Sequence, residues 1–218
     1  SDTNAWGFAE DTGATVVSVD YRLAPEHPYP AAFDDCYGVL IWLAEKGTEI
    51  GVDSARIAVV GDSAGGSLTA ALALAARDRG GPEIAGQAML YPCTGLPPTS
   101  QSYIDNAVGP GLTTSAMASY YELYLPTSLD PDLTVYAMPD RASDFTNLPP
   151  AYVHVAALDP IRDDGRVYAS KLALAGQRVT FREAHDMIHG FMRARLRGPA
   201  ARAEFDAICA FLRDVLTN

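Results

Sequence analysis

Short apolar runs alternate with amphipathic stretches along most of the chain. The runs at 15–19, 56–60, 86–90, 152–156 and 178–182 are candidate β-strands. Apolar residues recur at helical spacing in two groups: Phe33, Cys36, Tyr37, Leu40, Leu43 and Ala44, and Phe205, Ile208, Phe211, Leu212 and Val215. Strands this apolar, separated by helices, predict an α/β fold with a mostly parallel sheet and helices on both faces.

The chain length is typical of one domain. With 218 residues, we expect a single domain, 1–218, with one core. Pro199 is suited to begin the last helix, and Gly176 to end an earlier one. Ligands of such folds bind beyond the carboxyl ends of the strands, so residues at those ends are the candidates for function.

One long stretch interrupts the alternation of strands and helices. Residues 95–150 contain several prolines and no convincing strand. This length exceeds an ordinary connection, which predicts an insertion over the site, at about 95–146. A helix is expected within it, with an apolar stripe at Met117, Tyr120, Tyr121, Tyr124 and Leu125. Helical spacing alone favours packing over a substrate wall for this stripe.

The sequence GDSAGG at 61–66 directly follows the candidate strand at 56–60. It contains the pattern G-x-S-x-G, in which small neighbours let the backbone bend at the serine and leave its hydroxyl exposed above the sheet. Residues 67–77 are rich in strong helix formers, so strand, turn and helix occur in the required order. The sequence predicts a nucleophile elbow with Ser63 as the nucleophile.

A serine hydroxyl needs a base to take its proton and a third group to orient that base. His27 lies in a proline-rich turn, which indicates a role at the surface. His154 lies inside a candidate strand, which indicates a role in the core. His185 and His189 follow the last candidate strand, and Gly190 lets a loop present the ring of His189 at the sheet edge. We therefore favour His189 as the base.

The third group is expected at another strand end. Asp159 comes directly after a candidate strand, which suits an orienting carboxylate. Asp163 and Asp164 fall at the start of the next helix, where acidic residues are common because they interact favourably with the helix dipole. The chain order of Ser63, Asp159 and His189 is the one expected for an α/β-hydrolase.

The segment from His185 to His189 also suggests a different chemistry. Its sequence HDMIH is similar to the zinc motif H-E-x-x-H, and two histidines four apart on a helix can share a metal. The fit is poor because Asp186 is a shorter base, Gly190 would end the helix and no third ligand is evident. We therefore expect neither a metal nor a cofactor.

Composition narrows the class of partner. A formal charge of −11 argues against nucleic-acid and anionic-membrane surfaces and favours a neutral or cationic small molecule. Cys36, Cys93 and Cys209 are widely spaced, which favours buried reduced thiols. No apolar run approaches the length of a membrane span, and the start has no signal layout. We expect a cytoplasmic protein. The sequence leaves the oligomeric state open, and a homodimer is one of the possibilities.

Several blocks resemble the bacterial hormone-sensitive-lipase-like family of α/β-hydrolases over nearly the whole chain. They are DYRLAPE at 20–26, PYPAA at 28–32, GDSAGG at 61–66, LPP at 148–150, DPIRD at 159–163 and HGF at 189–191. The resemblance implies a serine carboxylesterase acting mostly on short-chain esters through an acyl-enzyme. It also implies a triad of Ser63, Asp159 and His189, and a helical cap formed in part by the insertion.

The chain departs from this family in the oxyanion hole. The family carries a His-Gly-Gly-Gly motif, upstream of the segment that corresponds to this start, whose glycine N–H groups supply most of the oxyanion hole. This chain has no such sequence, nor the family's N-terminal cap segment and first three strands. One of those strands lies in the family between the segments at 15–19 and 56–60. Because the first residue is Ser1 rather than methionine, we favour a truncated sequence over a sheet that has re-paired its strands.

The N–H of Ala64, the residue after the nucleophile, is the one evident oxyanion donor in the sequence. Losing a single donor typically costs about 10²- to 10³-fold in turnover. Two alternatives to an active esterase therefore stay open. One is a weakly active fragment, and the other is a non-catalytic binder of small molecules on the same fold.

Overall fold

The computed structural model describes residues 2–126 and 134–217. The helices are α1 (Asp2–Thr12), α2 (Ala31–Lys46), α3 (Ala64–Asp78), α4 (Gln101–Asp105), α5 (Thr114–Tyr124), α6 (Thr134–Ala137), α7 (Arg162–Leu174) and α8 (Pro199–Thr217). The strands are β1 (Ala58–Asp62), β2 (Gly86–Leu90), β3 (Ala151–Leu158) and β4 (Val179–Ile188). Short 3₁₀ turns are η1 (Gly47–Ile50), η3 (Pro139–Arg141) and η4 (Phe191–Ala194).

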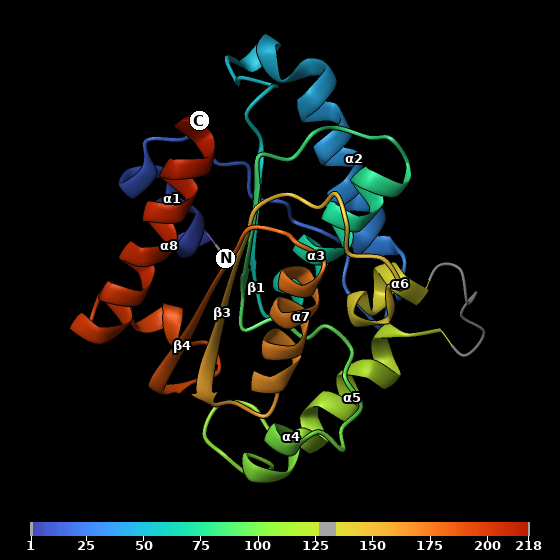
Figure 1. The fold of residues 1–218 in the computed structure, drawn as a ribbon, viewed down its shortest axis with the longest axis vertical. Helices are drawn as coiled ribbons and strands as arrows, with labels where there is room; N and C mark the ends of the chain where they lie inside the picture. Colours follow the sequence, from blue (N-terminus) through green and yellow to red (C-terminus); the bar gives the residue numbers. More distant parts are fainter. Residues whose placement is uncertain (1, 127–133, 218) are drawn as a thin grey trace.

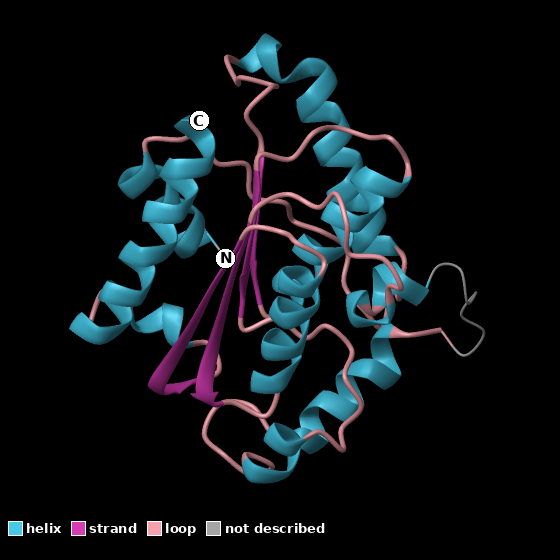
Figure 2. Ribbon diagram, in the orientation of Figure 1, coloured by secondary structure: helices cyan, strands magenta, loops and turns pink. Residues whose placement is uncertain are grey.

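The strands form a four-stranded sheet in the order β1-β2-β3-β4 (Figures 1 and 2). Every neighbouring pair is parallel, so all carboxyl ends point to one end of the molecule. Helices α4 and α5 lie at that end of the molecule (Figure 1). The predicted α/β class with a parallel sheet is confirmed.

Helices cover both faces of the sheet. Figure 1 shows α1 and α8 on one side and α2, α3 and α7 on the other. Side chains alternate between the faces along each strand: Leu90 packs in a cluster with Phe205 of α8, whereas Met89 packs in a cluster with Leu74 of α3. Burial on both faces explains why the inner strands β2 and β3 are mostly apolar, whereas the outer strand β4 is largely exposed and carries polar residues.

Residues 15–19, predicted as a strand, lie in no strand of the structure. The sheet ends at β1, which pairs with β2, and 15–19 bond with no neighbouring strand in the described part of the chain. Val16 and Val19 instead pack against the core clusters on opposite faces of the sheet. The prediction is wrong because apolar packing alone does not make a strand, which also needs a hydrogen-bonding partner. The alternative of a re-paired sheet is likewise not what the structure shows.

The other predicted elements are present. Strand β2 has the predicted bounds, while β3 and β4 are longer than expected, and α8 begins at Pro199. Between residues 95 and 150, the described residues contain helices and turns but no strand. Within α5, Met117 is buried and Tyr121 packs beside it, whereas Tyr120 is 59% exposed, so the stripe serves mainly packing. None of the described helices has the length and apolar character that a membrane span requires.

Candidate active site

Ser63 lies at the turn between β1 and α3, at the carboxyl edge of the sheet. Its φ of 57° and ψ of −120° form a conformation that residues other than glycine rarely adopt. The turn is held because the Ser63 N–H donates to the Leu90 carbonyl at 2.9 Å. The Ser63 carbonyl in turn accepts from the Gly66 N–H at 2.9 Å. This strained strand-to-helix turn is the backbone geometry that the G-x-S-x-G pattern predicts.

Two glycines of the motif, Gly61 and Gly66, are required because other parts of the chain approach them closely. A Cβ on Gly61 would lie 2.2 Å from the carbonyl oxygen of Gly65, so the chain could not turn back on itself with a larger residue there. A Cβ on Gly66 would lie 2.9 Å from Cβ of Pro92. The sequence G-x-S-x-G-G therefore encodes a strand and a helix packed against each other at the serine.

Asp159 directly follows β3 and is completely buried. Its Oδ1 accepts a hydrogen bond of 3.0 Å from the N–H of Ile161, which fixes the orientation of the carboxylate. The other oxygen, Oδ2, lies 2.7 Å from Nδ1 of His189. Asp159 therefore has one oxygen tied to its own turn and one aimed at the imidazole.

His189 follows the last strand and bridges the carboxylate and the hydroxyl. Its Nε2 lies 2.8 Å from Oγ of Ser63. With the ring proton on Nδ1, the imidazole donates to Asp159 and accepts from the Ser63 hydroxyl. The turn after it depends on Gly190, whose φ of 78° is the left-handed conformation that favours glycine. The structure thus brings together the three side chains singled out in the sequence.

Tyr91 is a neighbour of the site that sequence reasoning missed. It follows β2, and its ring meets the ring of His189 edge-on, with centroids 4.9 Å apart. The same ring packs against Phe191 at 5.3 Å. Burial, followed by the charge of Asp62, raises the pKa of the Tyr91 hydroxyl, so it stays neutral. Its position at the carboxyl end of a strand, like that of Asp159, was the available signal.

The remaining histidines do not join this group. His154 is fully buried in β3, and its Nε2 lies 3.0 Å from Glu204. Burial lowers the pKa of His154 to about 4, so its role in the core is that of a neutral ring. His185 lies exposed within β4, where the zinc interpretation required a helix. Among the described residues, no group of three or more His, Cys, Asp or Glu could hold a metal ion.

The cysteines are free thiols rather than alternative nucleophiles. Cys36 and Cys209 are buried, and Cys93 is partly buried. Burial raises the pKa to about 11 for Cys36 and Cys93, and to about 12 for Cys209. Since the thiolate is the reactive form, none of them is activated at neutral pH.

Asp163 and Asp164 lie in the first turn of α7, as predicted. Oδ2 of Asp163 accepts a 2.9 Å hydrogen bond from the N–H of Ser102. Oδ1 of Asp164 accepts hydrogen bonds from the N–H groups of Gly95 and Leu96, at 3.1 and 3.3 Å. Both carboxyl groups therefore connect α7 to the segment that follows β2, and neither contacts His189.

Ala64 is exposed and is the first residue of α3. The first N–H groups of a helix have no acceptor within the helix, so that of Ala64 is available to an oxygen beside Ser63. The arrangement can support acyl transfer: a hydroxyl next to a base, a base held by a carboxylate, and a donor beside the hydroxyl.

Comparison with known proteins gives a consistent family. A family model described as alpha/beta hydrolase fold matches residues 1–193. The chain is 43% identical over 203 residues to the protein named Esterase LipI of Mycobacterium tuberculosis, covering 93% of this chain and 63% of that protein. It is 36% identical over 195 residues to an ethyl acetate hydrolase of Pseudomonas putida, covering 88% and 60%. The chain therefore spans less than two thirds of the length of these curated relatives.

Solved structures agree with the fold. The crystal structure of a thermostable esterase from Pseudomonas putida has a TM-score of 0.92 at 35% identity, covering 100% of this chain and 70% of that one. An esterase of Pyrobaculum calidifontis has a TM-score of 0.91 at 38% identity, covering 100% and 72%.

Proposed function

The chain belongs to the alpha/beta hydrolase fold family, and on this basis we propose that it acts as a serine carboxylesterase on short-chain esters. Its likeness to the hormone-sensitive-lipase-like members is confirmed by the curated esterases and carboxylesterases that it matches. The observation that carries the proposal is the unbroken chain of hydrogen-bond distances from Asp159 through His189 to Ser63, at 2.7 and 2.8 Å.

In the first half of the proposed reaction, Oγ of Ser63 attacks the ester carbonyl carbon while Nε2 of His189 takes the hydroxyl proton. Asp159 stabilises the positive charge that develops on the imidazole. The tetrahedral intermediate then expels the alcohol, which leaves with the proton from Nε2. The acyl group remains on Ser63 as an ester.

In the second half, water takes the place of the alcohol. His189 removes a proton from the water, which attacks the acyl carbon, and returns a proton to Oγ of Ser63 as the carboxylic acid leaves. The N–H of Ala64 is the proposed donor to the oxyanion in both halves. No metal or redox cofactor enters this sequence of steps.

Two observations support the proposed class of substrate. The net charge of −11 favours a neutral or cationic molecule over an anionic one. A relative named ethyl acetate hydrolase is consistent with a small acyl group. The cytoplasmic location and the homodimer stay predictions from the sequence.

The proposal is tested with p-nitrophenyl acetate, butyrate and dodecanoate, and with a phosphonate probe that reacts with activated serines. We expect turnover to fall from acetate and butyrate to dodecanoate, and the probe to add once, on the peptide that contains Ser63. Ser63→Ala should lower the rate by at least about 10³-fold and abolish labelling. Ser119→Ala, which changes an exposed serine of α5, is the control. Retained hydrolysis in Ser63→Ala would overturn the proposal.

A further inference from the structure

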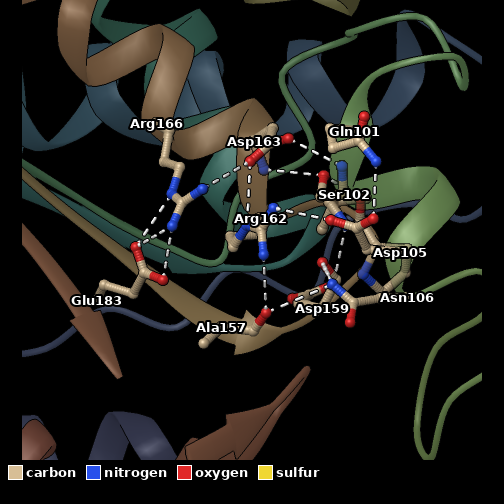
Figure 3. Close-up of polar contacts among 12 residues, drawn as sticks. Gln101, Ser102, Asp105, Asn106, Ala157, Asp159, Arg162, Asp163, Arg166 and Glu183 are labelled. Carbon is tan, nitrogen blue, oxygen red and sulfur yellow. Dashed lines mark hydrogen bonds and ion pairs between the residues drawn. The ribbon is translucent and has the colours of Figure 1, made fainter. Parts of the chain in front are cut away.

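Helix α4 contacts the turn that carries Asp159, between β3 and α7 (Figure 3). Ser102 of α4 is fully buried, and its Oγ donates a 2.7 Å hydrogen bond to the carbonyl of Pro160. The same oxygen accepts from the N–H of Asp163 at 3.1 Å. The hydroxyl of Ser102 thus holds the turn on both sides of Ile161.

Asn106, directly after α4, provides a second attachment. Its Nδ2 donates to the carbonyl of Asp159 at 3.1 Å and to that of Ala157 at 3.4 Å. The pairing of β3 with β4 is irregular between Ala156 and Leu158, so Ala157 lies outside the regular ladder. Ser102 and Asn106 therefore bind carbonyls in and beside the turn at 159–161, here called the acid turn. They do so where the pairing of β3 with β4 is interrupted.

Ion pairs brace the surface on which α4 rests. Arg162 contacts Asp163 at 3.0 Å and also donates to the Ala157 carbonyl at 3.3 Å. Arg166 contacts Asp163 at 3.2 Å and Glu183 of β4 at 2.7 Å. Figure 3 shows these contacts as one network that runs from Glu183 to Asn106. The acid turn is thereby held between α4 on one side and α7 with β4 on the other.

We propose that Ser102 and Asn106 are positioning residues for Asp159, through which the segment after β2 controls the geometry of the carboxylate at His189. This inference rests on the proposed esterase function. Asp159 reaches His189 through a single oxygen, so a shift of its backbone directly changes that contact. Misplacement of a catalytic group by about 1 Å can cost about 10²-fold in rate.

The test compares Ser102→Ala and Asn106→Ala with Gln101→Ala in hydrolysis of p-nitrophenyl acetate. Gln101 lies on the same helix, and its exposed amide donates to Asp105. We expect kcat to fall about 10- to 100-fold in the first two variants, with KM within about twofold of the wild type. Gln101→Ala should retain the wild-type kcat. Should Ser102→Ala fail to fold, the half-buried Asn106 carries the test.

A double-mutant cycle separates positioning from general loss of structure. Because triad members act as a unit, Ser102→Ala and Asn106→Ala should cause no further loss of kcat in an Asp159→Asn background. The inference would be overturned if kcat fell by the same factor in both backgrounds, or if the single variants kept the wild-type kcat. Either result would leave the esterase proposal intact. A wild-type protein that neither hydrolyses esters nor reacts with the phosphonate would overturn both.

Discussion

The ring of Tyr91 forms one side of the space in which the imidazole of His189 lies, with the two centroids 4.9 Å apart and the planes at 64°. The contact is edge-on, which is a favoured geometry for aromatic pairs. Tyr91 also reaches Asp62 through its hydroxyl, at 3.3 Å, so its ring is fixed at both ends. Its packing therefore restricts how far the imidazole can rotate away from Ser63.

Replacing this ring should affect turnover more than removing its hydroxyl. We expect Tyr91→Leu to lower kcat for p-nitrophenyl acetate by about tenfold, because the imidazole gains rotational freedom. Tyr91→Phe keeps the ring and loses only contacts of the hydroxyl, with Asp62 and with the backbone of Met192, so its kcat should stay within about twofold. Equal losses in the two variants would mean that the hydroxyl, rather than the ring, matters.

Asp159→Asn should lower kcat by about 10⁴-fold. The amide no longer stabilises the tautomer of His189 that accepts the Ser63 proton, although its size is nearly unchanged. The rate of phosphonate labelling of Ser63 should fall in parallel. Asp186→Asn, an exposed carboxylate near His189 in the chain, is the matched control. A variant with near-normal turnover would remove Asp159 from the proposed mechanism.

Gly61→Ala should destabilise the protein by about 1–3 kcal/mol, because its Cβ would overlap the backbone of Gly65. The comparison is Gly65→Ala, whose Cβ has no neighbour within 4 Å and which places a better helix former in α3. Urea unfolding of both variants measures the difference in the free energy of unfolding. A Gly61→Ala protein as stable as the wild type would contradict the packing described for the elbow.

Asp164 should make stability depend on pH in the opposite sense to most carboxylates. Burial raises its pKa to about 7. Hydrogen bonds from the N–H groups of Gly95 and Leu96 lower the pKa and offset only part of this rise. An unfolded aspartate titrates near pH 4, so between about pH 4 and 7 the folded state keeps a proton that the unfolded state has released. The contribution of Asp164 is therefore complete below about pH 4 and is lost as the pH rises to about 7.

Urea unfolding of the wild type and Asp164→Asn at pH 5 and pH 7.5 tests this dependence. The stability of the wild type relative to the variant should decrease with rising pH, by at most about 1.4 kcal/mol per unit within the window. Asp186→Asn, measured in the same way, controls for the change in surface charge. A difference that is constant or grows with pH would contradict a raised pKa for Asp164.

The sequence predicts β2 and β3 well because these two inner strands are buried over most of their length and are therefore mostly apolar. The same signal misled at residues 15–19, since hydrophobicity indicates contact with the core but not the presence of a bonding neighbour. Local patterns also placed Ser63, Asp159 and His189 at strand ends. Ser102 and Asn106 were missed because only the folded chain brings them to the Asp159 turn, more than 50 positions away in sequence.

The three polar side chains at the carboxyl edge come from different strand ends: Ser63 follows β1, Asp159 follows β3 and His189 follows β4. β1 is an outer strand of the sheet in the described part of the chain and is joined to β3 only through β2. If β1 detached while the other strands stayed paired, the hydroxyl of Ser63 would leave the imidazole of His189 although most of the protein remained native. The speed of covalent capture at Ser63 would then report local opening of one sheet edge before any global unfolding signal changed.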